Sequence, residues 1–316
     1  MQSIDTVMPR VRHACAVPVS DEQLWEMSAR YVAEGLRAGD RVVYFEDESV
    51  QQLLGRLADD GVHAEDALDE GRLLVMPTED TREVLSRPVA WLEDILHALV
   101  DDSLRRGYKG VRFTCQASWS LRRAGGVGTV EYEGGLARVL AARRAAGALC
   151  FYDQTRFPAE LIGELRSMHH HEVSAPSVYD DGLLRITNTA LGGVRLAGQG
   201  DHSNRGVLDR LLDTVLDEAL RAPSGPTSVT VDLSSLRFLD VAGSMALVSA
   251  ADRFPITHRL VLQGARPCVH RVLERCGALF TPQLDLRAAP EPIRIDVPLP
   301  RSSNLAKHER VPAHRS

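Results

Sequence analysis

The sequence lacks any long run of apolar residues. Its longest uncharged and largely apolar stretch, near Val241–Ala251, is far shorter than the ~20 residues that a helix needs to cross a bilayer. Residues Met1–Val19 have neither the apolar core nor the overall plan of a secretory signal peptide. We therefore expect a cytoplasmic protein that no segment anchors in a membrane.

Cysteine is scarce, with five in 316 residues, and no two of them form a Cys-x-x-Cys pair. An odd number at wide spacing excludes the dense disulfide framework of small secreted domains. The pattern is typical of reduced thiols in the cytosol. The cysteines are Cys15, Cys115, Cys150, Cys268 and Cys276.

A phosphate-binding loop is also missing, because no glycine-rich segment ends in Gly-Lys-Ser/Thr. Gly125–Gly128 is rich in glycine, but no such pair follows it, so we interpret it as a flexible turn. The net charge of -6 and pI near 6.0 argue against a nucleic-acid-binding protein, which usually has a basic face. The hydrophobic fraction of 44% and the length of 316 residues instead suit two folded domains.

Strand-like and helix-like segments alternate through the first half. Ser20 and Gln23 form a capping-box pattern, after which apolar residues recur at helical spacing. Further predicted helices are Val50–Leu57, Trp91–Leu104, Val130–Arg144 and Pro158–Met168, and predicted strands are Arg41–Phe45, Leu73–Met76, Gly110–Cys115 and Ala148–Tyr152. Such alternation predicts a parallel sheet with helices on both faces. Its ligands should bind beyond the carboxyl ends of the strands, just after Phe45, Phe113 and Phe151.

A turn-rich segment, Ser174–Gly182, marks the expected boundary between two domains, residues 10–175 and 182–288. The second domain contains an amphipathic helix from Val207 to Leu220 and shorter helices at 240–251 and 269–276. Its predicted strands are Leu183–Thr187, Gly193–Leu196, Ser228–Leu233, Leu236–Leu239, Arg259–Gln263 and Gln283–Leu286. Residues 289–316 are rich in proline and locally basic, and we predict a disordered tail.

One run in the second half, Val231–Gly243, has the sequence VDLSSLRFLDVAG. It resembles the signature of STAS domains, the family of anti-sigma-factor antagonists, and the strand and helix within Arg259–Gly277 resemble those that follow in that family. The likeness covers about Leu183–Leu286. It implies a small α/β domain whose partner is an anti-sigma factor or a kinase-like protein.

Asp240 stands where a strand ends and a helix begins, so its carboxylate can cap the first turn at the positive end of the helix dipole. In many members of the family the next residue is a serine that a partner kinase phosphorylates. Here that residue is Val241, and the next is Ala242. The resemblance implies a partner-binding face of Asp240, Val241, Ala242, Gly243 and Ser244 without the usual phosphate switch; Ser244 is the alternative acceptor.

Several segments of the first half match a second family in order and spacing. They are His13-Ala14-Cys15, Tyr31–Gly39 with Arg41–Tyr44, Gly107–Arg112 with Ser118-Trp119, Glu131–Glu133, and Leu149–Asp153 with Arg156-Phe157. Together they resemble the MEDS family of sensory domains over about Arg12–Met168. The resemblance implies a RecA/KaiC-like parallel-sheet domain, here lacking a P-loop, that binds a small organic ligand and is fused to an output domain.

Polar and reactive side chains are expected near one end of this sheet, where they would line a ligand pocket. These residues are His13, Cys15, Cys115, Trp119, Cys150, Tyr152 and Asp153. The alternative is that Cys115 and Cys150 are small core residues, since free cysteine is among the most buried residue types.

The run His169-His170-His171 suggests a metal site, but successive helical residues point in different directions and cannot all bind one ion. His13 and Cys15 could supply only two zinc ligands. We therefore predict no metal and no cofactor.

These observations predict a bacterial signalling or transcription regulator that is not an enzyme and has no nucleic-acid or membrane partner. A small ligand would act on the first domain and change what the second domain binds. One alternative is an enzyme, either a nucleotide hydrolase or a Cys/His-dependent hydrolase, but no catalytic motif of known spacing supports it. Another is a scaffold that binds no ligand.

Overall fold

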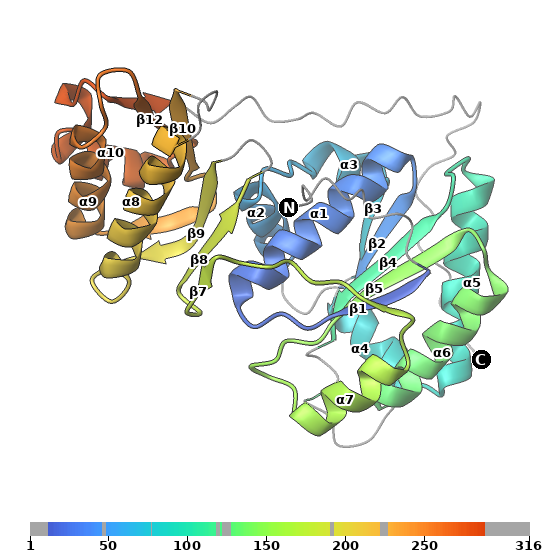
Figure 1. The fold of residues 1–316 in the computed structure, drawn as a ribbon. Coiled ribbons are helices and arrows are strands. Elements are labelled where there is room, and N and C mark those ends of the chain that lie inside the picture. Colours follow the sequence, from blue (N-terminus) through green and yellow to red (C-terminus); the bar gives the residue numbers. More distant parts are fainter. Residues whose placement is uncertain are drawn as a thin grey trace.

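The structure, a computed structural model, describes residues 12–45, 49–76, 78–117, 121, 128–189, 193–221 and 227–287. Within this part of the chain, two α/β units follow one another, each built on its own sheet (Figure 1). The predicted tail, Trp119 and most of the Gly125–Gly128 turn lie outside the described residues. Every described helix is too short or too polar to span a bilayer.

The N-terminal unit contains six parallel strands in the order β3-β2-β4-β5-β1-β6, which confirms the predicted parallel sheet. The strands are β1 (His13–Ala16), β2 (Arg41–Phe45), β3 (Leu73–Met76), β4 (Val111–Gln116), β5 (Ala146–Phe151) and β6 (His171–Glu172). The two strands that were not predicted, β1 and β6, have only four and two residues.

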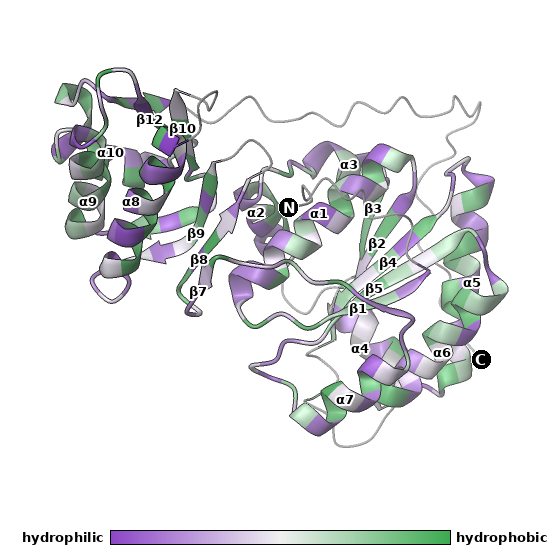
Figure 2. Cartoon of the chain, in the orientation of Figure 1, coloured by the Kyte–Doolittle hydropathy of each residue, from purple (hydrophilic) through white to green (hydrophobic). Residues whose placement is uncertain are grey.

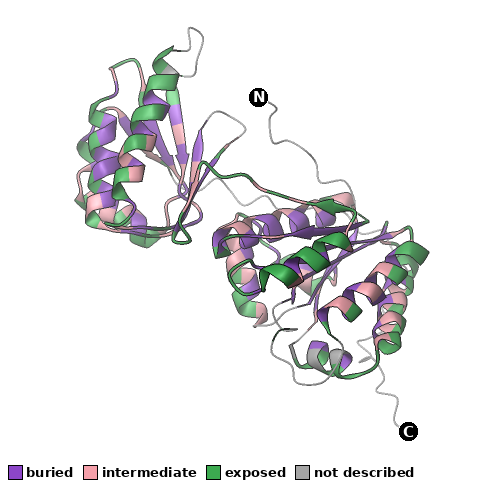
Figure 3. Ribbon diagram, turned by 60° about the horizontal axis from the view of Figure 1, so that its bottom comes forward, coloured by how far each residue is buried: buried purple, intermediate pink, exposed green. Residues whose placement is uncertain are grey.

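Helices cover both faces of this sheet. One face packs against α1 (Asp21–Ala38), α2 (Val50–Asp59) and α3 (Glu65–Asp69), and the other against α4 (Thr78–Ser86), α5 (Val89–Arg105), α6 (Thr129–Ala142) and α7 (Ala159–Ser167). The short helices α3 and α4 were not predicted. Apolar residues line the strands and the inner sides of the helices (Figure 2), and the strands are buried between the two helical layers (Figure 3).

The turn between β1 and α1 is a helix cap and not a phosphate-binding loop. Four residues, Val17–Ser20, lead directly into α1, where the Ser20 side chain accepts from the Gln23 N–H at 3.2 Å. The Gln23 side chain accepts from the Val19 N–H at 2.9 Å, so the predicted reciprocal bond to Ser20 is replaced by one to its neighbour. This turn carries no glycine and cannot wrap a phosphate in backbone N–H groups.

The C-terminal unit has a mixed sheet in the order β13-β12-β10-β9-β8-β7, with β11 also paired to β9. Its strands are β7 (Tyr179–Asp180), β8 (Leu184–Asn188), β9 (Val194–Gly200), β10 (Ser228–Asp232), β11 (Leu236–Leu239), β12 (Arg259–Gln263) and β13 (Leu284–Arg287). Its helices are α8 (Arg205–Arg221), α9 (Val241–Asp252) and α10 (Pro267–Arg275), and their apolar residues form one core with the sheet. This sheet begins at Tyr179, slightly before the boundary expected at residue 182.

The other face of the second sheet meets the N-terminal unit, where β7–β9 lie beside α1 and α2 (Figure 1). Side chains alternate along a strand, so the arginines of β8 and β9 point away from the helical core. Arg185 donates to Glu26 of α1 at 2.9 Å, and Arg195 donates to Asp60, just after α2, at 2.6 Å. The two units therefore touch through a basic face and an acidic one.

Candidate functional site

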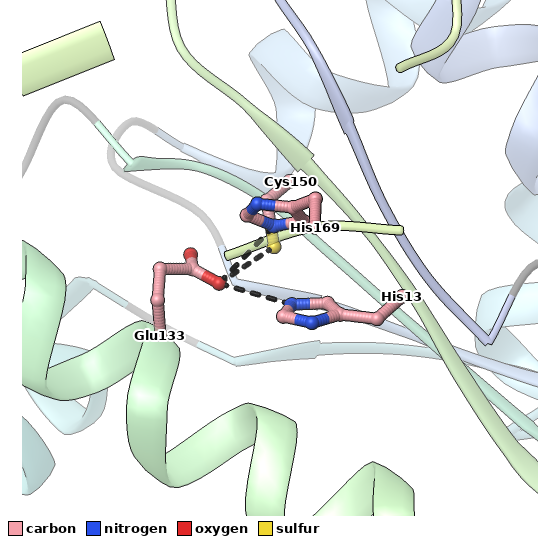
Figure 4. Close-up of side chains that lie close together, drawn as sticks. All are labelled: His13, Glu133, Cys150 and His169. Carbon is pink, nitrogen blue, oxygen red and sulfur yellow. Dashed lines mark hydrogen bonds and ion pairs between the residues drawn. The ribbon is translucent and has the colours of Figure 1, made fainter. Parts of the chain in front are cut away.

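A cluster of four polar side chains lies inside the N-terminal unit (Figure 4). It consists of His13 on β1, Glu133 on α6, Cys150 on β5 and His169 just after α7. One ligand atom from each, imidazole nitrogen, carboxylate oxygen or thiol sulfur, lies within 4.8 Å of all the others. The side chains of His169 and Glu133 are fully buried, and that of His13 is 4% exposed. We call these four residues the HECH cluster.

The carboxylate oxygen Oε2 of Glu133 is the centre of the HECH cluster. His13 Nε2 donates to it at 3.1 Å, and the Cys150 thiol donates to it at 3.5 Å. His169 Nε2 lies 3.4 Å away but makes no hydrogen bond there. The two imidazole rings are adjacent, with centroids 4.1 Å apart. Side chains from β1, β5 and the segment after α7 thus converge on one buried oxygen of a side chain of α6.

Two atoms of this cluster have no hydrogen-bond partner although they are buried: His169 Nε2 and Glu133 Oε1. His169 Nδ1 lies 2.7 Å from the carbonyl oxygen of Leu165, which can only accept, so Nδ1 carries a proton. In the neutral ring, Nε2 then presents a lone pair toward the carboxylate. Buried polar atoms without partners are uncommon and costly, so this arrangement favours a binding site over a purely structural network.

Burial alone would raise the pKa of Glu133, but the hydrogen bond from His13 and the proximity of the His169 imidazole lower it to about 2. Glu133 is therefore ionised at neutral pH. A hydrogen bond with Cys115, burial and the negative charge of Glu133 raise the pKa of Cys150 well above its usual value. Burial likewise raises the pKa of Tyr152. Glu133 is thus a buried carboxylate that accepts from His13 Nε2 and from the protonated thiol of Cys150.

Three cysteines form a row across adjacent strands, since Cys150 pairs in register with Cys15 on one side and with Cys115 on the other. All three are about 1% exposed. Cys115 Sγ lies 3.9 Å from the hydroxyl of Tyr132, and burial raises the pKa of Cys15 to about 11. This placement agrees with the alternative that Cys115 and Cys150 are core residues.

A separate pocket of about 380 Å³ opens beyond the carboxyl ends of β1, β4 and β5. Its lining includes Trp25, Arg56, Gln116, Asp153 and Arg156. This is the position that the strand-end rule predicts for a ligand. Of the expected pocket residues that the structure describes, only Asp153 lines it, because His13, Cys15, Cys115, Cys150 and Tyr152 point instead into the core between the sheet and α5–α7.

Arg56 joins this pocket to the contact between the two units. Its guanidinium lies 3.5 Å from Glu22 and 3.8 Å from Asp59. Glu22 also pairs with Arg237, and Asp59 with Arg266, both from the C-terminal unit. An anionic group in the pocket would therefore compete for an arginine whose carboxylate partners hold the second unit.

The strand–helix junction of the C-terminal unit is partly open to solvent. Asp240 caps α9 by accepting from the Gly243 N–H at 2.6 Å. Val241 is 61% exposed and Met245 is 52% exposed. Gly243 and Ser244 are buried, so neither offers a side chain to a partner. Because Ser244 is 0% exposed, its hydroxyl is also inaccessible to a kinase in this conformation.

Two residues of the HECH cluster were missed by the sequence analysis, which expected no metal site. Glu133 belongs to the segment Glu131–Glu133 that resembles the MEDS family, and His169 begins a histidine run whose helical geometry argues against a shared ion. Among the three histidines of that run, the cluster includes His169, while His170 and His171 are exposed. A charged residue on an otherwise apolar face of a predicted helix is the signal that could have identified Glu133, because α6 buries that face.

Comparison with known proteins identifies two families along the chain. The family described as MEthanogen/methylotroph, DcmR Sensory domain (MEDS) matches residues 12–170, half of the chain. The family described as Mlab, STAS domain matches residues 188–278. No curated protein matches the chain. Both families match in the predicted order, and domains of these kinds belong to signalling and regulatory proteins.

Solved structures with a similar fold include two archaeal proteins. The flagellar accessory protein FlaH from Methanocaldococcus jannaschii is 11% identical, with a TM-score of 0.39 over 59% of this chain and 77% of that one. The KaiC-like protein PH0186 from Pyrococcus horikoshii is 14% identical, with a TM-score of 0.40 over 58% of this chain and 77% of that one.

Proposed function

Because the chain belongs to the MEDS family and carries a STAS domain after its sensory domain, we propose that it is a non-enzymatic signalling regulator that couples a small ligand to protein docking. The MEDS domain receives the ligand. The STAS domain binds an anti-sigma factor or a related kinase-like partner, and so regulates transcription. Ligand binding, not phosphorylation, controls that docking.

The observation that carries this proposal is the position of Ser235 between the two domains. Its hydroxyl donates to the backbone carbonyl of Asp59 at 2.6 Å and lies 3.1 Å from the Asp60 carboxylate. Ser235 immediately precedes β11, and Asp240 immediately follows it. A four-residue strand thus connects the domain contact to the docking junction, and a shift at one end has a short, rigid route to the other.

The pocket at the strand ends supports a ligand that carries both an aromatic or apolar part and a negative charge. Trp25 offers an aromatic wall, while Arg56 and Arg156 offer positive charge. Because Arg56 also lies beside Glu22 and Asp59, a bound anion alters the electrostatic balance at the domain contact. A ligand shifts a conformational equilibrium only if it binds the two states differently, and Arg56 provides that difference.

The exposed end of α9 supports docking without phosphate. Val241 occupies the position after the capping aspartate, and its side chain is aliphatic and largely exposed. A partner that contacts Val241 and Met245 would be excluded by a charge placed there, because a charge in an apolar interface is costly to desolvate. The alternative of a cysteine hydrolase lacks support, because the thiols of Cys115 and Cys150 are buried and the pKa of Cys150 is raised.

The docking function can be tested with Val241→Asp and a matched control, Ile256→Asp. Both replace an exposed aliphatic residue, but Ile256, 90% exposed, follows the opposite end of α9. Full-length bait from each variant is compared with the unaltered chain in pull-downs at physiological salt, without kinase treatment. We expect the same partner on the unaltered chain and on Ile256→Asp, and at least a tenfold loss on Val241→Asp. Equal recovery from all three, or none from any, contradicts the proposed docking face.

The ligand can be sought by native mass spectrometry of the full chain purified from its own host. We expect an added mass that is lost on Gln116→Ala, in the pocket, and retained on Cys115→Ser, in the core row. An added mass lost only on Cys115→Ser would place the ligand in the core and overturn the pocket assignment.

A further inference from the structure

We propose that the HECH cluster, defined above by His13, Glu133, Cys150 and His169, is a closed zinc site of the MEDS domain. The site would bind one Zn²⁺ through two imidazole nitrogens, one thiolate and one carboxylate. Binding would release the Cys150 thiol proton to solvent and leave the His13 ring proton on Nδ1 instead of Nε2. It is distinct from the strand-end pocket and does not depend on the docking function proposed above.

The donor set is the first argument. Imidazole, thiolate and carboxylate are the three ligand types that Zn²⁺ takes in proteins, and zinc sites with four protein ligands are tetrahedral. Mg²⁺ and Ca²⁺ prefer sites made of oxygen atoms alone, which this cluster does not offer. Each ligand comes from a different element, so one ion would link β1, α6, β5 and the segment after α7.

The distances are the second argument. At zinc–ligand lengths of about 2.0–2.3 Å, ligand atoms of a tetrahedral site lie roughly 3.3–3.7 Å from one another. Glu133 Oε2 already lies 3.1 Å from His13 Nε2, 3.4 Å from His169 Nε2 and 3.5 Å from Cys150 Sγ. No pair of ligand atoms is separated by more than 4.8 Å. A contraction of about 1 Å in the widest pairs completes the tetrahedron.

The orientation of His169 is the third argument. Histidines that bind metals usually donate their other ring N–H to a carbonyl or carboxylate, which fixes the tautomer. His169 makes this contact, from Nδ1 to the Leu165 carbonyl at 2.7 Å, and its fully buried Nε2 faces the cluster without a hydrogen-bond partner. A zinc ion would accept that lone pair and also neutralise the carboxylate of Glu133, whose second oxygen is unpartnered.

A closed site of four protein ligands suits zinc that holds structure, since a catalytic zinc keeps a position for water. The structure to be held is the exit from the sensory domain. His169 lies two residues before β6, which pairs with β1 at Ala14 and Cys15, and the linker to the C-terminal unit follows β6. Metal binding would therefore fix the last segment of the MEDS domain against its first strand.

The test measures metal on the full chain after chelation and reloading with Zn²⁺, and separately with Co²⁺ as a spectroscopic probe. We expect one ion per chain, tetrahedral Co²⁺ absorption and a thiolate-to-cobalt charge-transfer band. Cys150→Ser should abolish that band, and His169→Gln and Glu133→Gln should each weaken zinc binding by more than roughly a hundredfold, beyond the effect of losing an outer-shell partner. Cys115→Ser, in the neighbouring strand, should bind like the unaltered chain.

A double variant, His170→Gln with His171→Gln, controls for uptake by the exposed histidines and should also bind like the unaltered chain. The proposal is overturned if the unaltered chain takes up no stoichiometric Zn²⁺ or Co²⁺, a result that does not depend on whether any variant folds. It is equally overturned if Cys150→Ser keeps the charge-transfer band. Either failure would leave the docking proposal standing, because the pull-downs report on α9 alone.

Discussion

Arg195 of the STAS domain and Asp60 of the sensory domain form an ion pair with an N–O distance of 2.6 Å. The Asp60 carboxylate is 8% exposed and the Arg195 guanidinium 19% exposed. This contact joins the end of α2 to β9, and β9 pairs with the strand that leads to Asp240. The protonation state of the Asp60 carboxylate therefore affects the free energy of the contact between the two domains.

Docking of the two domains should weaken as the pH rises toward neutrality. Burial raises the pKa of Asp60 from 3.8 to about 6, against the opposing effects of Arg195, Ser235 and Arg56 and with a small addition from Glu26. Between those pH values the docked state holds a proton that the separated state has lost. The free energy of docking is thus most favourable below about pH 4. As the pH rises to about 6 and beyond, it becomes less favourable by at most about 3 kcal/mol.

Urea unfolding at a series of pH values from 5 to 7.5 measures this effect on the unaltered chain and on Asp60→Asn, which cannot titrate. The difference in midpoint between the two proteins should shift in favour of Asp60→Asn as the pH rises. A difference that stays constant across the series would mean that Arg195 keeps Asp60 ionised throughout.

Removing the arginine should loosen the domain contact. Arg195→Ala leaves Asp60 without its nearest cation, which we expect to cost about 2 kcal/mol, or roughly thirtyfold in local opening. Hydrogen exchange at the end of α2 and at β11 should become faster by that factor. Arg221→Ala is the matched control, because Arg221 is 80% exposed and pairs with Asp217 of its own helix. Similar exchange in both variants would argue against a domain contact through Arg195.

The secondary structure was largely predictable because most elements carry their signal locally. Arg41–Phe45 and Leu236–Leu239 are strands with the predicted bounds, since each is a short run that contains apolar residues and ends at a polar residue or turn. The sequence His13–Ala16, HACA, was not recognised as a strand, because alanine has little β propensity and four residues give no periodicity. Its place in the sheet comes from pairing with β5 and β6.

The HECH cluster could not be predicted in the same way. His13 and Glu133 are separated by 120 positions, and their contact depends on which face of α6 packs on the sheet. Five of the expected pocket residues gather on one face of the sheet instead of at its end, for a related reason. Alternation along β5 sends Cys150 and Tyr152 to one face of the sheet, while Asp153, beyond the strand, lies at its end. The rule that ligands bind beyond the carboxyl ends of parallel strands locates one edge of the sheet. It does not tell toward which face of the sheet each side chain points.

Two glycine substitutions should have opposite effects on stability. Gly198 has a φ of 93°, and a Cβ there would lie 2.1 Å from the carbonyl oxygen of Leu183 and 3.2 Å from Glu22 Cγ. Gly198→Ala should therefore destabilise the STAS domain by more than about 2 kcal/mol. Gly163, within α7, has no atom within 4 Å of such a Cβ, so Gly163→Ala should stabilise the chain by up to about 1 kcal/mol. Circular dichroism during urea unfolding measures both, and a stable Gly198→Ala would contradict the close approach of β8 and β9.

The capping role of Asp240 gives a prediction that separates stability from docking. Asp240→Ala removes the acceptor of the Gly243 N–H and the negative charge at the start of α9, which should cost about 1 kcal/mol. Asp240→Asn keeps an acceptor oxygen and should lose only a few tenths of that. Since all three tryptophans precede the STAS domain, hydrogen exchange in the first turn of α9 is the suitable measurement.

We expect amide exchange in that turn to be about fivefold faster in Asp240→Ala, and nearly unchanged in Asp240→Asn. Because Val241 remains exposed in both variants, partner recovery should fall only as far as the first turn frays. If Asp240→Asn instead loses the partner while its exchange stays slow, the carboxylate itself contacts the partner, and its charge belongs to the docking surface as well as to the helix cap.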